Sequence, residues 1–218
     1  MGALQCKCME SWRRFCPDWT VKCADGDALR EEGVPEFVHE AVRRGKWAFA
    51  SDWYRFMALH REGGVYLDLD VELVAPIDDL LGEEWVAGQW LSNGEVVMEP
   101  GAGLAMEKDN PLAKRMLDHY ATAPYGETVV WAHMAAAMRN TSPIKVLPPS
   151  WFSPIAPNGE IRRTADTRAI HWYAMSWASP QRRIARWLCW HGMGGLARAA
   201  LAARNLLPSF SHRRHVAS

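Results

Sequence analysis

The chain has 218 residues, which suits one α/β domain of ordinary size, or such a domain followed by a tail. Apolar residues make up 49% and charged residues 23% of the sequence, close to average globular usage, which excludes global disorder. The formal net charge is zero, but the last acidic residue is Asp166 while arginines continue to Arg214, so the carboxyl-terminal quarter is basic.

The first part of the chain contains two helical patterns. Residues 10–16 are typical of the end of an amphipathic helix, which Pro17 terminates. The spacing predicts a short strand over residues 19–23. A second helix is expected at residues 36–44, where apolar residues recur at helical spacing, and Gly45 is suited to end it.

A third helix leads to the most informative stretch of the sequence. Ser51 is suited to cap a helix over residues 51–60, and the Gly63-Gly64 pair is suited to release the chain afterwards. An apolar run follows and leads into Asp68 and Asp70, which predicts a buried strand that ends where these acids begin.

The rest of the chain mixes strands and helices, which gives an α/β fold class. Helices are expected at residues 111–120 and 129–138. Strands are expected at residues 85–90, 94–97, 104–106, 145–147 and 169–172. Beyond Trp177 the pattern predicts a helical tail with arginines on one side and apolar residues on the other.

Two carboxylates separated by one residue, where a buried strand leaves the core, can present oxygen ligands to Mg²⁺ or Mn²⁺. Such a cation keeps waters and binds through few carboxylates plus substrate phosphates, so the pattern points to a ligand that carries phosphate. The alternative is that Asp68 and Asp70 are solvated residues at a strand end.

The surrounding sequence favours the metal site. Residues 45–59 and 63–72 closely resemble the glycosyltransferase sugar-binding region with a DXD motif, glycosyltransferase family 32, which includes capsular polysaccharide and mannosyltransferase-like enzymes. Looser similarity extends from Trp12 to Trp177 and includes the pair His171-Trp172. The match is long and ordered, so it covers much more than the three-residue motif.

This resemblance implies a GT-A-like domain over residues 1–177, with a Rossmann-like sheet that binds a nucleotide sugar, and a helical basic tail over residues 178–218. It also implies transfer with retention of the anomeric configuration. The family opens with a strand that lines the nucleotide base, and only residues 1–9 precede the first helix pattern here. We therefore expect a GT-A-like domain that lacks the first strand.

The resemblance also implies roles for particular residues. Asp68 and Asp70 would be catalytic: Asp70 would ligate Mn²⁺ or Mg²⁺, and Asp68 would contact the ribose or a metal-bound water. Asp52, Arg55 and Tyr66 would bind the donor, with the carboxylate accepting hydrogen bonds from sugar hydroxyls and the guanidinium facing the diphosphate or sugar.

Two further residues come from the end of the domain. His171 would complete the metal or diphosphate end, and Trp177 would lie over the leaving group as a substrate-binding residue. Each of these residues also has an interpretation that involves no ligand. Asp52 and Arg55 could form an i,i+3 surface ion pair, and His171 and Trp177 could belong to the core.

One departure from the family concerns sugar contacts. The family carries an asparagine-glycine turn before its acceptor-side strand, whereas this chain has Gly101-Ala102-Gly103, which offers no side chain able to hydrogen-bond a sugar. Either the chain is an incomplete copy or those contacts come from elsewhere.

The sequence therefore predicts a metal-dependent, retaining hexosyltransferase of polysaccharide biosynthesis, with a nucleotide-sugar donor and a glycan or lipid-linked acceptor, and no nucleic-acid partner. One alternative is a non-catalytic remnant of the family that still binds sugar. A second is a phosphohydrolase like the haloacid dehalogenase-like phosphatases, which Glu72 disfavours because that family has Thr or Val at this position.

The cysteines and the apolar runs bear on location. The five cysteines are an odd number, and neither a signal-peptide core nor an apolar run of about 18 residues is present, which indicates a cytoplasmic setting. The cysteines also lack the paired spacing of a zinc site. The basic tail could pack on the domain or contact anionic lipid at the inner face of the membrane.

Overall fold

The structure is a computed structural model, and it describes the greater part of the chain. The described residues are 2–23, 27, 29, 33–91, 93–126, 128, 130–137, 144–156, 159–174, 184, 188 and 193. The chain divides into two units, residues 1–156 with 161–177, and residues 157–160 with 178–218. The helices expected in the basic tail lie outside the described residues.

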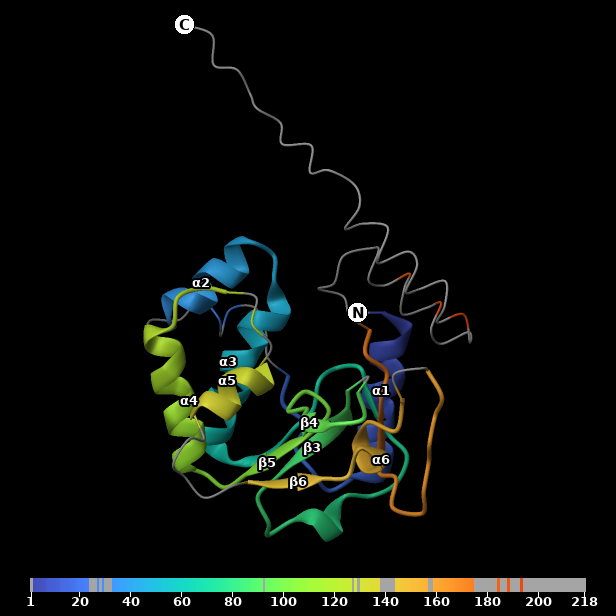
Figure 1. Ribbon diagram of the computed structural model, residues 1–218. Helices are drawn as coiled ribbons and strands as arrows, with labels where there is room; N and C mark the ends of the chain where they lie inside the picture. Colours follow the sequence, from blue (N-terminus) through green and yellow to red (C-terminus); the bar gives the residue numbers. More distant parts are fainter. Residues whose placement is uncertain are drawn as a thin grey trace, which may run out of the picture. The chain divides into compact units, whose positions relative to one another are not determined.

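A five-stranded mixed sheet forms the centre of the first unit (Figure 1). Its strands run in the order β1 (Gly64–Tyr66), β5 (Leu104–Met106), β3 (Trp85–Trp90) and β4 (Val96–Met98), and these neighbours are antiparallel. β6 (Lys145–Leu147) pairs with β3 in parallel. The mixed sheet and its helices confirm the α/β class and are consistent with the GT-A-like fold.

A separate pair of strands holds the segment that follows the two acids. β2 (Val71–Leu73) pairs antiparallel with β7 (Ala169–His171), and Val71 stands opposite His171. Because Asp70 directly precedes β2, this register brings it close to the end of β7 although about a hundred residues separate the two along the chain.

Helices cover both faces of the central sheet. The helices of one layer are α2 (Glu36–Arg43), α3 (Trp47–Glu62), α4 (Pro111–Thr122) and α5 (Val130–Ala137). Successive strand residues point to opposite faces, so Leu104 and Met106 join the apolar cluster beneath these helices. Ala105 and Trp85 belong to the opposite cluster, which includes residues of α1 (Ala3–Phe15) and α6 (Pro149–Phe152).

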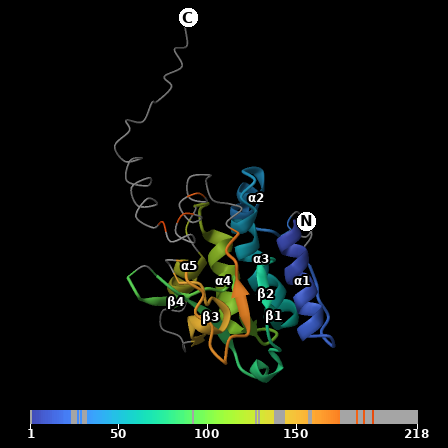
Figure 2. The same cartoon turned by 90° about the vertical axis from the view of Figure 1, so that its right-hand side faces the viewer.

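Helix α1 lies alongside β2 (Figure 2). The Trp12 Nε1–H donates a hydrogen bond of 2.7 Å to the Val71 carbonyl, and the Leu73 N–H donates one of 2.9 Å to Ser11 Oγ. Both contacts fix the strand that begins immediately after Asp70. Helix α1 therefore helps to position the acidic turn.

Helix α3 carries two of the expected donor residues, and its start differs from the prediction. It begins at Trp47, so Ser51 does not cap it, and the Ser51 hydroxyl instead donates 2.7 Å to the Ala48 carbonyl within the helix. Apolar packing of Phe49 and Ala50 extends the helix by a turn. Its end is confirmed at Gly63, which has a φ of 70°.

Two other expectations need correction. Residues 19–23 form no strand, because Val21 is exposed and the segment pairs with no strand of the described chain. The strand expected at 94–97 lies at β4, because Gly94 adopts a φ of 89° in the preceding turn.

No helix among the described residues is long and apolar enough to cross a bilayer.

Candidate functional site

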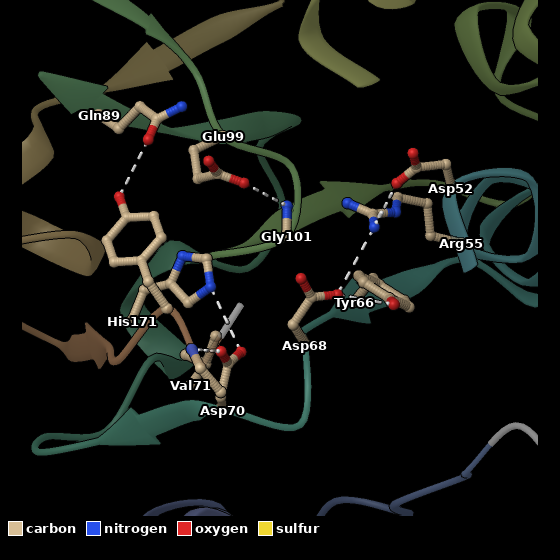
Figure 3. A network of polar contacts seen from close by, with 12 residues as sticks. Asp52, Arg55, Tyr66, Asp68, Asp70, Val71, Gln89, Glu99, Gly101 and His171 are labelled. Carbon is tan, nitrogen blue, oxygen red and sulfur yellow. Dashed lines mark hydrogen bonds and ion pairs between the residues drawn. The ribbon is translucent and has the colours of Figure 1, made fainter. Parts of the chain in front are cut away.

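A buried ion pair on α3 forms one end of the candidate site (Figure 3). Asp52 and Arg55 are 7% and 3% exposed, and Arg55 Nη2 donates 2.8 Å to Asp52 Oδ1. Arg55 Nη1 is buried and has no hydrogen-bond partner in the described part of the protein. An unpaired buried guanidinium nitrogen is costly, so this atom is suited to receive an anionic or hydroxyl-bearing ligand.

The ion pair is linked to the first acid of the DXD motif. Asp68 Oδ1 lies 3.6 Å from Arg55 Nη2 and accepts a 2.8 Å hydrogen bond from the Tyr66 hydroxyl. The Arg55 guanidinium stands over the Tyr66 ring at 4.8 Å from its centroid. Asp52, Arg55, Tyr66 and Asp68 therefore form one connected group, which makes the i,i+3 pair part of a buried network and not a surface contact.

The second acid of the motif is fixed by the chain around β7. Asp70 Oδ2 accepts a 2.6 Å hydrogen bond from the Ala174 N–H, and Asp70 Oδ1 lies 3.3 Å from His171 Nε2. The Tyr173 ring stacks on His171 with centroids 3.9 Å apart. His171 Nδ1 is buried without a partner among the described residues, so this imidazole retains one unused nitrogen.

Asp68, Asp70 and His171 can offer one ligand atom each within 4.8 Å of one another. Two carboxylates and an imidazole suit Mn²⁺, and Mg²⁺ accepts the carboxylates with waters completing its shell. The donor set and the unused imidazole nitrogen therefore fit the divalent cation that the motif implies. The sequence predicted Asp70 and His171 as its ligands, and Asp68 joins them in this group.

The surroundings shift the pKa values of Asp70 and Asp52 in opposite directions. Although burial raises the pKa of Asp70, the hydrogen bond and charge of His171 and the Ala174 N–H outweigh it, and the net pKa is lowered. Burial lowers the pKa of His171, but Asp70 and nearby carboxylates raise it overall. Burial raises the pKa of Asp52 to about 7, because lost hydration outweighs the attraction of Arg55.

Glu99 and Gly101 also belong to the site, and no motif indicated them. The Gly101 N–H donates 3.3 Å to Glu99 Oε1, and the Gly101 carbonyl accepts 2.8 Å from the Asp68 N–H. A Cβ on Gly101 would lie 2.3 Å from Asp68 Oδ2, so only glycine permits this approach. The glycine-rich stretch at 101–103 was the available signal, and Trp177 lies outside the described residues.

The fold and the site together define an α/β domain that carries an aspartate pair beside a buried arginine. Residues 2–87 match the family described as "Glycosyltransferase sugar-binding region containing DXD motif". The matched stretch is similar to this sugar-binding region, and Asp52, Arg55, Tyr66, Asp68 and Asp70 lie within it.

The similarity to individual proteins is more limited. No curated protein matches the chain. A solved structure entitled "PaToxG Glycosyltransferase" is similar at 23% identity, over 54% of this chain and 44% of that chain, with a TM-score of 0.38. The aligned part thus spans less than half of that protein. Glu99, Gly101 and His171 lie beyond the family match, and the geometry alone brings Glu99 and Gly101 into the site.

Proposed function

We propose that this protein is a metal-dependent glycosyltransferase of the family 32 type, which transfers a hexose from a nucleotide-sugar donor with retention of configuration. The observation that carries the proposal is the pair of buried, unused nitrogens, Arg55 Nη1 and His171 Nδ1, on either side of the aspartate pair. Arg55 Nη1, which can only donate, favours a ligand with negative charge or hydroxyl oxygens, and the His171 imidazole can face the cation that such a ligand brings.

Arg55 and Asp52 would hold the donor at the α3 end. The guanidinium, fixed by Asp52 and oriented over Tyr66, can donate through Nη1 to a diphosphate or sugar oxygen. Because the group is already desolvated and fixed, it would lose little freedom when the donor binds. This arrangement supports the binding roles assigned to Asp52, Arg55 and Tyr66.

Asp68, Asp70 and His171 would hold Mn²⁺ or Mg²⁺ at the other end. The cation would neutralise charge on the leaving nucleoside diphosphate. The bond from the anomeric carbon to the diphosphate oxygen would break, a bond to the acceptor oxygen would form, and the proton of the acceptor hydroxyl would pass to the leaving diphosphate. Ala174 and Tyr173 orient Asp70 and His171 for this task. The acceptor would be a glycan or a lipid-linked sugar of polysaccharide biosynthesis, such as a capsular polysaccharide or mannan.

A donor-turnover assay tests the proposal. UDP- and GDP-hexoses are incubated with the full chain and Mn²⁺, and release of nucleoside diphosphate is followed for wild type, Asp70→Asn and the exposed control Asp118→Asn. Wild type and control should release diphosphate, and Asp70→Asn should lose about a hundredfold or more. Absence of metal-dependent release by wild type with every donor would refute the enzyme and favour a sugar-binding remnant.

The basic tail and the cytoplasmic location form a separate part of the proposal. Arginines on one side of residues 182–191, with tryptophan and leucine on the other, suit contact with the anionic inner face of a membrane, where a lipid-linked acceptor would be present. Flotation with anionic liposomes should be sensitive to salt and lost on deletion of residues 182–218. Equal flotation of both proteins would contradict membrane contact through the tail.

A further inference from the structure

Glu99 is a half-buried carboxylate to which the proposed reaction assigns no role. It follows β4 directly, and its backbone is fixed on both sides, because its N–H donates 2.6 Å to the Ala87 carbonyl and its own carbonyl accepts 3.0 Å from the Ala102 N–H. The only hydrogen bond that links its side chain to a described residue is the 3.3 Å contact from the Gly101 N–H. This carboxylate therefore has acceptor capacity to spare.

The Glu99 side chain faces the candidate site. A Cβ on Gly101 would lie 2.3 Å from Asp68 Oδ2 and 3.1 Å from Glu99 Oε1, so both carboxylates converge on one point of the backbone. Figure 3 shows Glu99 across Gly101 from Asp68, with His171 below it. Charges on His171, Asp68 and Arg55 all act on it.

Metal ligation does not account for this position. Asp68, Asp70 and His171 form the group whose ligand atoms lie close enough to share an ion, and Glu99 is not a member of it. Two carboxylates that approach each other repel, and cations or hydrogen-bond donors that reach them offset the cost. Because the Gly101 N–H is the one donor to the Glu99 side chain among the described residues, a ligand of this site can bring further donors to it, and sugar hydroxyls are such donors.

We propose that Glu99 accepts hydrogen bonds from hydroxyl groups of the donor's sugar and is a specificity-determining residue for that sugar. The inference rests on the proposed function. It also assigns the sugar contact that Gly101-Ala102-Gly103 cannot make, because the Glu99 carboxylate, two residues before Gly101, reaches the site across that glycine. A site that hydrogen-bonds a hydroxyl rejects analogues that lack it.

The test compares nucleotide with nucleotide sugar by calorimetry in the presence of Mn²⁺. The probes are UDP and GDP, each paired with its glucose, galactose or mannose conjugate, and the proteins are wild type, Glu99→Ala, Glu99→Gln and the exposed control Glu107→Ala. Loss of Glu99 should leave diphosphate affinity within about twofold of wild type and lower nucleotide-sugar affinity by about tenfold or more. Glu99→Gln, which keeps an acceptor oxygen, should lose less.

Each outcome separates this inference from the function on which it rests. Normal diphosphate binding by Glu99→Ala also demonstrates that the variant is folded, and Glu99→Gln replaces it if it is not. If the variants lose diphosphate and nucleotide-sugar affinity equally, or lose neither, Glu99 does not recognise the sugar, although the proposed function stands. If wild type binds no diphosphate with Mn²⁺, the proposed function fails and this inference fails with it.

Discussion

Arg55 is buried between two carboxylates, and its loss would leave Asp52 in the interior without its cation. Removing one partner of a buried ion pair costs about 3 kcal/mol. We expect Arg55→Met to lower the free energy of unfolding by about that amount at about pH 8, where Asp52 is ionised. Urea denaturation measures the change, and the exposed Arg61→Met serves as control. Equal stability of the two variants would contradict a buried ionic network.

Gly101 is the residue whose missing side chain lets Asp68 and Glu99 approach the same loop. Gly101→Ala should displace Asp68, because the new Cβ would lie 2.3 Å from its Oδ2. We expect affinity for UDP or GDP with Mn²⁺ to fall by about tenfold. Gly126→Ala is the matched control, since its Cβ would meet nothing closer than Thr128 Oγ1 at 3.8 Å. Undiminished binding by Gly101→Ala would show that Asp68 is not held by this contact.

The residues of the site differ in how far the sequence could predict them. Asp52, Arg55, Tyr66, Asp68 and Asp70 lie in one continuous stretch whose spacing carries the family pattern. No sequence pattern marks Glu99 as a site residue, because its place in the site depends on the β4 register and on the close approach at Gly101. Tertiary contacts of this kind leave no periodic signal in a single sequence.

At the scale of elements, α1 is tied to β2 by a buried indole. The Trp12 Nε1–H donates to the Val71 carbonyl, and Trp12 is 8% exposed. Trp12→Phe keeps most of the apolar contact but removes this donor from a buried carbonyl, so we expect a loss of about 1–3 kcal/mol in the free energy of unfolding. Trp47→Phe, at a tryptophan that is 49% exposed, should change stability little. Urea titration of both variants provides the comparison, and an unchanged midpoint for Trp12→Phe would contradict the anchoring role.

Helices α4 and α5 meet at two histidines whose rings share a hydrogen bond. His119 Nε2 lies 2.7 Å from His133 Nδ1. Burial, and then the neighbouring His119, lower the pKa of His133 below its ordinary value of 6.5. The unfolded chain therefore binds the proton more readily. The stability that neutral His133 contributes is fully present above about pH 6.5 and is lost as the pH falls through the lowered folded pKa.

We accordingly expect wild type to lose more stability than His133→Gln when the pH falls from about 7.5 to about 5. His39→Gln lies on α2, outside this pair, and should follow wild type. Urea midpoints measured across this pH range decide the matter. Parallel pH profiles for wild type and His133→Gln would show that the α4–α5 contact does not titrate in the expected sense.

At the scale of the whole molecule, the candidate site is assembled from three distant parts of the chain: α3 with the acidic turn, the loop after β4, and the end of β7. The sequence predicted most of the elements, because apolar periodicity and glycine stops are local signals. The family resemblance predicted that His171 joins the site, but it did not predict the β2–β7 register that brings Asp70 to His171. Long-range pairing is a property of the complete fold, so position along the chain does not reveal it.

The proposed activity is the metal-dependent cleavage of a nucleotide sugar with retention of configuration. Proton NMR of UDP- and GDP-hexoses with the full chain and Mg²⁺ follows the anomeric signal directly. We expect loss of the donor signal, first appearance of the sugar with the anomeric configuration of the donor, and complete arrest by EDTA. Cleavage that continues in EDTA, or a first product of inverted configuration, would contradict it.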